Sequence, residues 1–147
     1  MRSFTAADQT GVRDLVLSGL RERWDATFDP DANPDLDDIS SFYVDRGADV
    51  VVIEVDDRIV ATGTLIPLSS CRGRIVRMSV DREYRRQGLA REVVAELVRR
   101  AIDQQLTEVV VLTDAPWTSA CALYLACGFV QVGQDETDTH FAMSPVG

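Results

Sequence analysis

The chain has 147 residues, of which 46% are hydrophobic, and this length and composition fit one folded domain and exclude a globally disordered chain. Its net charge is −9 and all 15 basic residues are arginines, which argues against nucleic acid as a partner. No segment reaches the roughly 20 apolar residues that span a bilayer, and residues 1–11 are too polar for a secretory signal, so we expect no membrane partner and a cytoplasmic location.

The N-terminal segment predicts a short strand and then a helix. Residues 2–4 could form the strand, and Thr5 with Asp8 three residues later resembles a capping box, which commonly begins a helix. Small and apolar residues then recur on one helical face. These are Val12, Leu15, Val16, Gly19 and Leu20.

An acidic stretch follows. Residues 25–57 hold eleven acidic residues against one arginine, Arg46, and most of these carboxylates fit a solvated surface. Within the stretch, residues 25–34 are rich in Asp and Pro and predict a loop. Residues 34–44 predict a second short helix, with Leu36, Ile39 and Tyr43 on one side.

Three strands are predicted next. Residues 50–55 and 58–68 are rich in β-branched residues, and the turn at Asp56 and Asp57 joins them as a hairpin. Residues 74–80 form the third strand. Strict alternation along it puts Val76, Met78 and Val80 on one face, and Ile75, Arg77 and Ser79 on the other.

The remaining chain alternates helices with strands. Residues 88–105 predict a long helix with a broad apolar face, and residues 109–112 predict a short buried strand. Residues 119–127 predict a helix that Gly128 ends. The last two strands are predicted at residues 129–132 and 140–143. The order β-α-α-β-β-β-α-β-α-β-β predicts a mixed α/β layer fold.

The cysteines give no sign of a disulfide or metal site. Cys71, Cys121 and Cys127 form no CxxC pair, and their odd number argues against a disulfide framework. Adding His140 does not produce the spacing of a zinc site. We expect small apolar roles for the cysteines and no bound metal.

Residues 85–90, Arg-Arg-Gln-Gly-Leu-Ala, carry the strongest chemical signal. They precede the long predicted helix, whose free N-terminal N–H groups favour an anion, and Gly88 lets the backbone approach a ligand closely. Four arginines and a single acid, Glu83, lie between Arg82 and Arg91. The pattern is neither a P-loop nor a GxGxxG loop. A solvated arginine cluster on an ordinary turn is the alternative.

Arg85, Gly88 and Ala90 match the [RQ]xxGx[GA] signature of the GNAT family of N-acetyltransferases. Residues 75–80, Ile-Val-Arg-Met-Ser-Val, look like the fourth strand of that family, and residues 123–129, Leu-Tyr-Leu-Ala-Cys-Gly-Phe, resemble its LYxxxGF element. The chain resembles the family over roughly its whole length, most closely at residues 74–129. The resemblance implies one N-acetyltransferase domain over residues 1–147. Its α/β fold would have a mixed, mostly antiparallel sheet flanked by helices, with splayed fourth and fifth strands.

The resemblance also implies acetyl-CoA as co-substrate. Backbone groups of Met78, Ser79 and Val80 would bond the pantetheine arm as an added strand would, although Met78 and Val80 also fit a plain core strand. Backbone N–H groups from Arg86 through Ala90 would hold the pyrophosphate, with arginine side chains helping. The implied cofactor-binding residues are Met78, Ser79, Val80, Arg85, Arg86, Gln87, Gly88, Leu89 and Ala90.

Tyr124 stands at the position of the family's catalytic proton donor, where a hydroxyl would protonate the leaving thiolate. Core packing is the alternative, because Ala120 and Leu123 share its helical face. A backbone N–H near Met78 or Ser79 would polarise the acetyl carbonyl.

Two positions depart from the family pattern. Arg74 stands near the place where some relatives carry a glutamate base, so Glu54, His140 or a water relay would have to take that role. For His140 a structural role is the simpler reading. Trp117 replaces an asparagine that contacts the cofactor in many relatives, and it would instead shape the acceptor pocket or cover the helix start.

The resemblance implies direct acetyl transfer to a primary amine, and the acceptors of the family include small amines, amino acids, antibiotics and protein amino groups. We expect a small acceptor, either cationic or amino-acid-like, and the sequence leaves a peptide open. Residues 25–57 include part of the expected acceptor side, where acidic groups would attract a cation. The alternative is a non-catalytic acyl-CoA-binding or sensing module of the same fold. The missing strand glutamate favours that alternative, whereas Tyr124 favours an enzyme. The sequence leaves a homodimer open.

Overall fold

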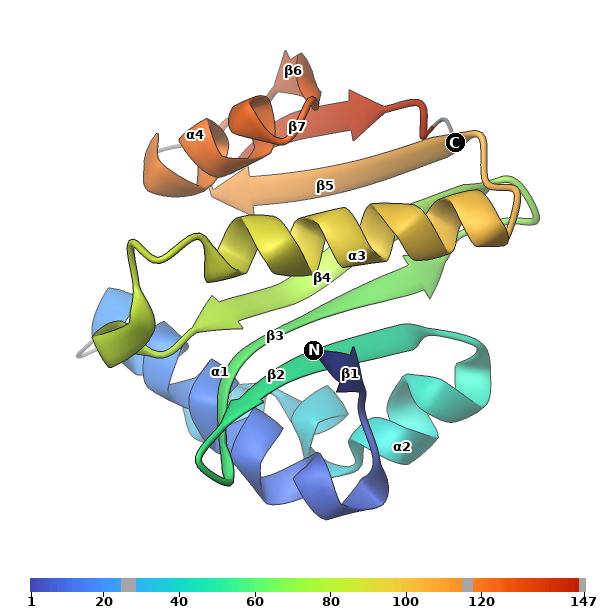
Figure 1. Ribbon diagram of the computed structural model, residues 1–147. Coiled ribbons are helices and arrows are strands. Elements are labelled where there is room, and N and C mark those ends of the chain that lie inside the picture. The colour runs from blue at the N-terminus through green and yellow to red at the C-terminus, as the bar shows by residue number, and fades with distance from the viewer. Residues whose placement is uncertain (25–28, 115–117, 146–147) are drawn as a thin grey trace.

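The computed structural model describes residues 1–24, 29–114 and 118–145, which form one seven-stranded sheet with helices on both faces (Figure 1). The strand order is β1-β2-β3-β4-β5-β7-β6. Neighbouring strands are antiparallel except β4 and β5, which are parallel. The strands are β1 (Arg2–Ser3), β2 (Asp49–Val55), β3 (Arg58–Pro67), β4 (Arg72–Val80), β5 (Glu108–Asp114), β6 (Val130–Gln134) and β7 (Asp138–Met143). The predicted order of elements and the mixed, mostly antiparallel sheet are confirmed.

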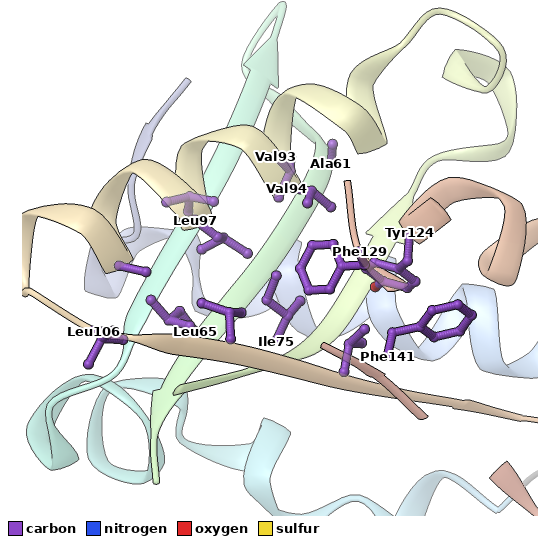
Figure 2. Packing of buried hydrophobic residues seen from close by; sticks show 14 of the residues in the cluster. Ala61, Leu65, Ile75, Val93, Val94, Leu97, Leu106, Tyr124, Phe129 and Phe141 are labelled. Carbon is purple, nitrogen blue, oxygen red and sulfur yellow. The ribbon is translucent and has the colours of Figure 1, made fainter. Parts of the chain in front are cut away.

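The helices divide between the two faces. They are α1 (Gln9–Trp24), α2 (Ile39–Phe42), α3 (Leu89–Asp103) and α4 (Thr118–Ala126). On one face, α3 buries Val93, Val94 and Leu97 in a core that also receives Tyr124 from α4 (Figure 2). On the other face, α1 and α2 form a second core with β2. Among the described residues, no helix is both long and apolar enough to cross a membrane.

Local sequence signals account for the starts and ends of several elements. The backbone N–H of Thr5 donates to the Asp8 carboxylate at 2.8 Å, as the capping box predicts. The hairpin turn between β2 and β3 places Asp56 and Asp57 at φ angles of 51° and 62°, the left-handed geometry that a two-residue hairpin requires. Gly128 follows α4 with a φ of 93°, as expected for a helix-ending glycine.

The predicted second helix is shorter than expected. Residues 34–44 contain the 3-10 helix Pro34–Asp37, then α2, then the start of the 3-10 helix Val44–Arg46. The side chain of Asp38 accepts a hydrogen bond from Ser41 N–H at 3.0 Å and so begins a new helix within the stretch. The predicted apolar side is confirmed, because Leu36, Ile39 and Tyr43 are all buried in the second core.

A bulge in β4 changes which residues share a face. Gly63 of β3 lies opposite two residues, Arg77 and Met78, and Arg77 has a φ of 54°. The predicted alternation therefore holds on each side of the bulge, but the prediction that Val76 shares a face with Met78 and Val80, and Ile75 with Ser79, is wrong. Ile75 lies with Met78 and Val80 in the core beneath α3. On the opposite face, Val76 packs in the second core and Ser79 contacts α1.

The bulge depends on the glycine opposite it. A Cβ on Gly63 would collide with the sulfur of Met78 and with Val93 of α3, so only glycine allows Met78 to lie there.

The parallel strands β4 and β5 separate after a short contact. Arg72, Gly73 and Arg74 pair with residues 108–110, and no strand of the described chain pairs with this edge of β4 over residues 75–80. From Val111 onward, β5 continues in pairing with β7 alone. The separation confirms the predicted splay and leaves an opening in the middle of the sheet.

Candidate functional site

A groove of about 770 Å³ lies at the opening between β4 and β5. Its walls come from α1, β4, β5, α4 and the N-terminal end of α3. Most predicted site residues line it: Met78, Ser79, Val80, Arg85, Arg86, Gly88, Leu89, Ala90 and Tyr124. Gln87 belongs to the same loop but is exposed and lies outside the lining. The structure thus brings together residues that are 46 positions apart in the chain, from Met78 to Tyr124.

The loop before α3 presents unused backbone donors to this groove. Gly88 begins α3 with a φ of 81°, and a Cβ added there would meet no atom within 4 Å, so the space above it is open. The first N–H to bond back onto Gly88 is that of Glu92, at 3.1 Å. Across the described residues, nothing accepts a hydrogen bond from the N–H groups of Leu89 or Ala90. Such a helix N-terminus suits a phosphate group.

The arginines around this loop are unequally engaged. Arg85 donates to both carboxylate oxygens of Glu22 at the end of α1, at 2.9 and 3.1 Å. This hydrogen bonding from Arg85 holds the pKa of Glu22 below its ordinary value. Arg86 has no ion-pair partner in the part of the chain that the structure describes, so its positive charge is uncompensated at the groove. The loop therefore combines a neutralised arginine with one available for an anion.

The unpaired edge of β4 forms the middle of the groove. Its backbone at Met78, Ser79 and Val80 faces no neighbouring strand on the β5 side, while the side chains of Met78 and Val80 pack into the core. Backbone bonding to a ligand and side-chain packing are therefore compatible here, as the sequence predicted. An extended ligand with amide groups could bond to this edge as peptides bond to open sheets.

Tyr124 lies at the inner end of the groove. Its side chain is 4% exposed and its ring contacts Phe129 and Phe141 at centroid distances of 5.6 and 6.1 Å (Figure 2). Burial, and to a smaller extent Cys127, raises the pKa of Tyr124 well above its ordinary value. No described residue exchanges a hydrogen bond with that hydroxyl. Tyr124 can therefore pack its ring in the core and still offer its hydroxyl as a proton donor.

A second cavity, of about 410 Å³, lies on the α1–α2 side of the sheet. It shares Ile75, Val76, Arg77 and Leu112 with the groove, so the two spaces lie next to each other at the split between β4 and β5. Its other lining residues are Pro34, Asp35, Phe42, Tyr43 and Arg74.

A buried network that sequence reasoning missed forms one wall of the second cavity. Arg77 donates to Asp35 at 2.8 and 2.9 Å, and the hydroxyl of Tyr43 donates to the same carboxylate at 2.5 Å. Burial opposes ionisation of Asp35, but the hydrogen bonds from Arg77 and Tyr43 outweigh it and hold the pKa of Asp35 below its ordinary value. Burial and the contact with Asp35 raise the pKa of Tyr43 to about 12. No local pattern links these residues, because Arg77 follows Asp35 by 42 positions.

The residues predicted as general base for the amine, Glu54 and His140, lie outside both cavities. Glu54 pairs with Arg2 at 2.7 Å, and His140 contacts Asp135 at 3.0 Å. A carboxylate that sequence reasoning did not consider, Asp138 on β7, lines the groove.

Trp117 lies outside the described residues. The cysteines are free, and no cluster of three metal-ligating side chains occurs within the described ranges.

Comparison with known proteins agrees with this geometry. Residues 14–129 match the model of the acetyltransferase (GNAT) family. The chain is 32% identical over 120 residues to human N-acetyltransferase 8, covering 78% of this chain and 53% of that protein. It is 34% identical over 110 residues to rat N-acetyltransferase 8, covering 71% and 50%. The chain thus spans about half the length of the curated relatives that it matches.

Solved structures share the fold at low sequence identity. A GNAT-family acetyltransferase from Staphylococcus aureus matches with a TM-score of 0.87 at 19% identity, covering 98% of this chain and 97% of that one. PaiA N-acetyltransferase from Thermoplasma acidophilum, solved in complex with coenzyme A, matches with a TM-score of 0.85 at 10% identity, covering 97% and 96%. The match at residues 14–129 covers both the groove loop and Tyr124, and it shows that the chain belongs to the acetyltransferase (GNAT) family.

Proposed function

We propose that this chain transfers the acetyl group of acetyl-CoA directly to the primary amine of a small acceptor, either cationic or amino-acid-like. The observation that carries the proposal is the convergence, in one groove, of the open β4 edge, the free N–H groups at Gly88 and the Tyr124 hydroxyl. PaiA, which shares the fold, was solved with coenzyme A. We further propose that residues 1–147 act as one N-acetyltransferase domain.

The groove residues fit the parts of acetyl-CoA in order. The N–H groups of Leu89 and Ala90, with Arg86 beside them, would bind the pyrophosphate. The backbone of Met78, Ser79 and Val80 would bond to the pantetheine amides, and Arg85 and Gln87 would contact the phosphates from the same loop. This arrangement would bring the thioester, the activated acetyl donor, to the inner end near Tyr124.

In the reaction, the neutral amine nitrogen attacks the thioester carbonyl carbon from the second cavity. A C–N bond forms, the C–S bond breaks and the amine nitrogen loses a proton. A backbone N–H at the β4 bulge, near Met78 or Ser79, would stabilise the oxyanion. Tyr124 would donate its proton to the departing sulfur and regain one from the amine through water. Tyr124 carries its proton at neutral pH, as a donor must, and its raised pKa makes it a weaker acid than an exposed tyrosine, so the thiolate rather than the tyrosine drives this transfer.

Since Glu54 and His140 do not reach either cavity, we propose that the ammonium form of the acceptor loses its extra proton before the attack and that water carries this proton to Asp138 at the edge of the groove. The cytoplasmic location and the homodimer remain predictions from the sequence.

The test is release of free thiol from acetyl-CoA with a panel of small amines, amino acids and peptides. The proposal predicts saturable release with at least one amine and an N-acetylated product of matching mass. If calorimetry shows acetyl-CoA binding but no amine releases thiol at any pH, the chain is a non-catalytic acyl-CoA-binding module instead. If acetyl-CoA does not bind at all, the proposed placement in the groove is wrong.

A further inference from the structure

Arg74 is the unusual residue of the second cavity. It lies on β4 between Gly73 and Ile75, both of which face the core beneath α3. The side chain of Arg74 therefore points to the opposite face, where it lines the cavity with Phe42 and Tyr43. β4 thus places a guanidinium in this cavity.

The guanidinium of Arg74 lacks a protein partner. Its Nε atom is buried and makes no hydrogen bond, which is true of no other buried side-chain nitrogen or oxygen among the described residues. Within the same ranges, Arg74 takes part in no ion pair. A buried donor without an acceptor is costly, and this cost falls when an anion binds.

The remaining charges of the cavity do not compensate Arg74. The single carboxylate in its lining, Asp35, is already bound by Arg77 and by the Tyr43 hydroxyl. The other lining residues of the cavity are uncharged: Pro34, Phe42, Ile75, Val76 and Leu112. The described lining therefore carries one positive charge in excess, and this charge repels a purely cationic amine.

We propose that the amine acceptor carries a carboxylate, as an amino acid does, and that Arg74 binds this carboxylate while the amine faces the split between β4 and β5. The proposal rests on the acetyl transfer proposed above and narrows its acceptor. A planar guanidinium matches a carboxylate with two parallel hydrogen bonds, which gives orientation as well as affinity. The apolar residues around it leave room for an uncharged acceptor side chain.

The experiment compares acceptors that differ only in the carboxylate. Thiol release from acetyl-CoA is measured with the panel of amino acids, with their carboxamides and with the corresponding decarboxylated amines. We expect kcat/KM for the preferred amino acid to exceed that of its carboxamide and its decarboxylated amine by at least tenfold. An aminophosphonate analogue tests whether another anion replaces the carboxylate, and we expect it to be a poorer acceptor.

Variants test the role of Arg74 itself. Arg74→Gln should reduce the ratio of kcat/KM between the amino acid and its carboxamide at least tenfold, mainly through KM, and Arg74→Lys should restore part of it. Arg72→Gln is the matched control, since Arg72 lies on the same strand, is exposed and pairs with Glu108 outside both cavities. That control should leave the ratio unchanged.

The outcomes separate this inference from the proposed function. If amines are acetylated but carboxamides and decarboxylated amines work as well as amino acids, the carboxylate proposal is overturned and the acetyltransferase proposal stands. A loss in Arg74→Gln that is equal for all acceptors also overturns it. If no amine is acetylated, the proposed function fails first. Should Arg74→Gln not fold, judged by thermal unfolding, the wild-type acceptor comparison decides alone.

Discussion

Arg77 and Asp35 join the bulge of β4 to the segment before α2 through two parallel hydrogen bonds, from Nε at 2.9 Å and from Nη2 at 2.8 Å. The pair holds Arg77 in its left-handed conformation, which is strained for any residue other than glycine. Because Asp35 also lines the second cavity, this pair links the wall of the proposed acceptor site to the backbone of the proposed oxyanion donor.

Asp35→Asn removes the charge that balances Arg77. We expect a loss of about 1–3 kcal/mol in the free energy of unfolding, because a half-buried guanidinium is left without its counter-ion. Denaturant unfolding at pH 7 measures it. Asp37→Asn is the control, because Asp37 is exposed and its ion pair with Arg13 is long, at 3.7 Å. This control should change the free energy of unfolding by no more than about 0.5 kcal/mol.

The stability that wild type has over Asp35→Asn should depend on pH. The pKa of Asp35 is lower in the folded chain than in an unfolded one, so the stabilisation is complete above the unfolded pKa of about 3.9 and is lost as pH falls through the folded value. The difference in stability between wild type and Asp35→Asn should therefore be constant near neutral pH and shrink below about pH 4. A difference that persisted in acid would mean that charge is not its cause.

Tyr124→Phe tests the proton donor without disturbing the core. The ring keeps its contacts with Phe129 and Phe141, so thermal stability should be close to that of wild type. We expect kcat to fall at least tenfold while acetyl-CoA affinity, measured by calorimetry, is retained. Unchanged kcat would show that water protonates the thiolate and that Tyr124 serves packing alone.

Gly88→Ala tests the phosphate-binding turn. Alanine in the left-handed conformation costs about 1–2 kcal/mol, and the added methyl group lies where the backbone would meet the pyrophosphate. We expect lower thermal stability and an acetyl-CoA affinity reduced at least fivefold. Gly133→Ala is matched to it, because it also has open space around the added carbon but no positive φ, and it lies outside the groove. Equal affinities in the two variants would contradict the proposed pyrophosphate position.

Glu22→Gln tests whether the ion pair restrains Arg85. Freed from Glu22, Arg85 should contribute its charge to the pyrophosphate site, and acetyl-CoA affinity should rise about two- to fivefold at low salt and less at high salt. Calorimetry at two ionic strengths measures this. The control Glu108→Gln breaks a similar surface pair, with Arg72, at the far end of the strand and should leave affinity unchanged. A fall in affinity with Glu22→Gln would instead mean that Glu22 positions Arg85 for the ligand.

Much of the fold and groove could be predicted because the signals are local. The apolar face of α3, the turn at Asp56 and Asp57 and the glycine before α3 each follow from neighbouring residues. The bulge could not be predicted, because one extra residue at Arg77 reverses the alternation, and Gly63, the glycine that leaves room for Met78, lies on another strand. The second cavity was missed for a related reason. Its polar wall joins Asp35 to Arg77 across the sheet, and the acidity of residues 25–57 gave no sign that this one carboxylate is neutralised.

The parting of β4 from β5 has a consequence for the integrity of the molecule. Among the described strands, the pairing of Arg72, Gly73 and Arg74 with residues 108–110 is the only backbone ladder between β1–β4 and β5–β7, and the rest of the contact is side-chain packing in the core beneath α3. A ligand that forms hydrogen bonds with the unpaired edge of β4 would fill the opening and extend the hydrogen-bonded sheet beyond the three paired residues. The midpoint of thermal unfolding would then rise with the concentration of that ligand, because the ligand would add backbone hydrogen bonds across the opening.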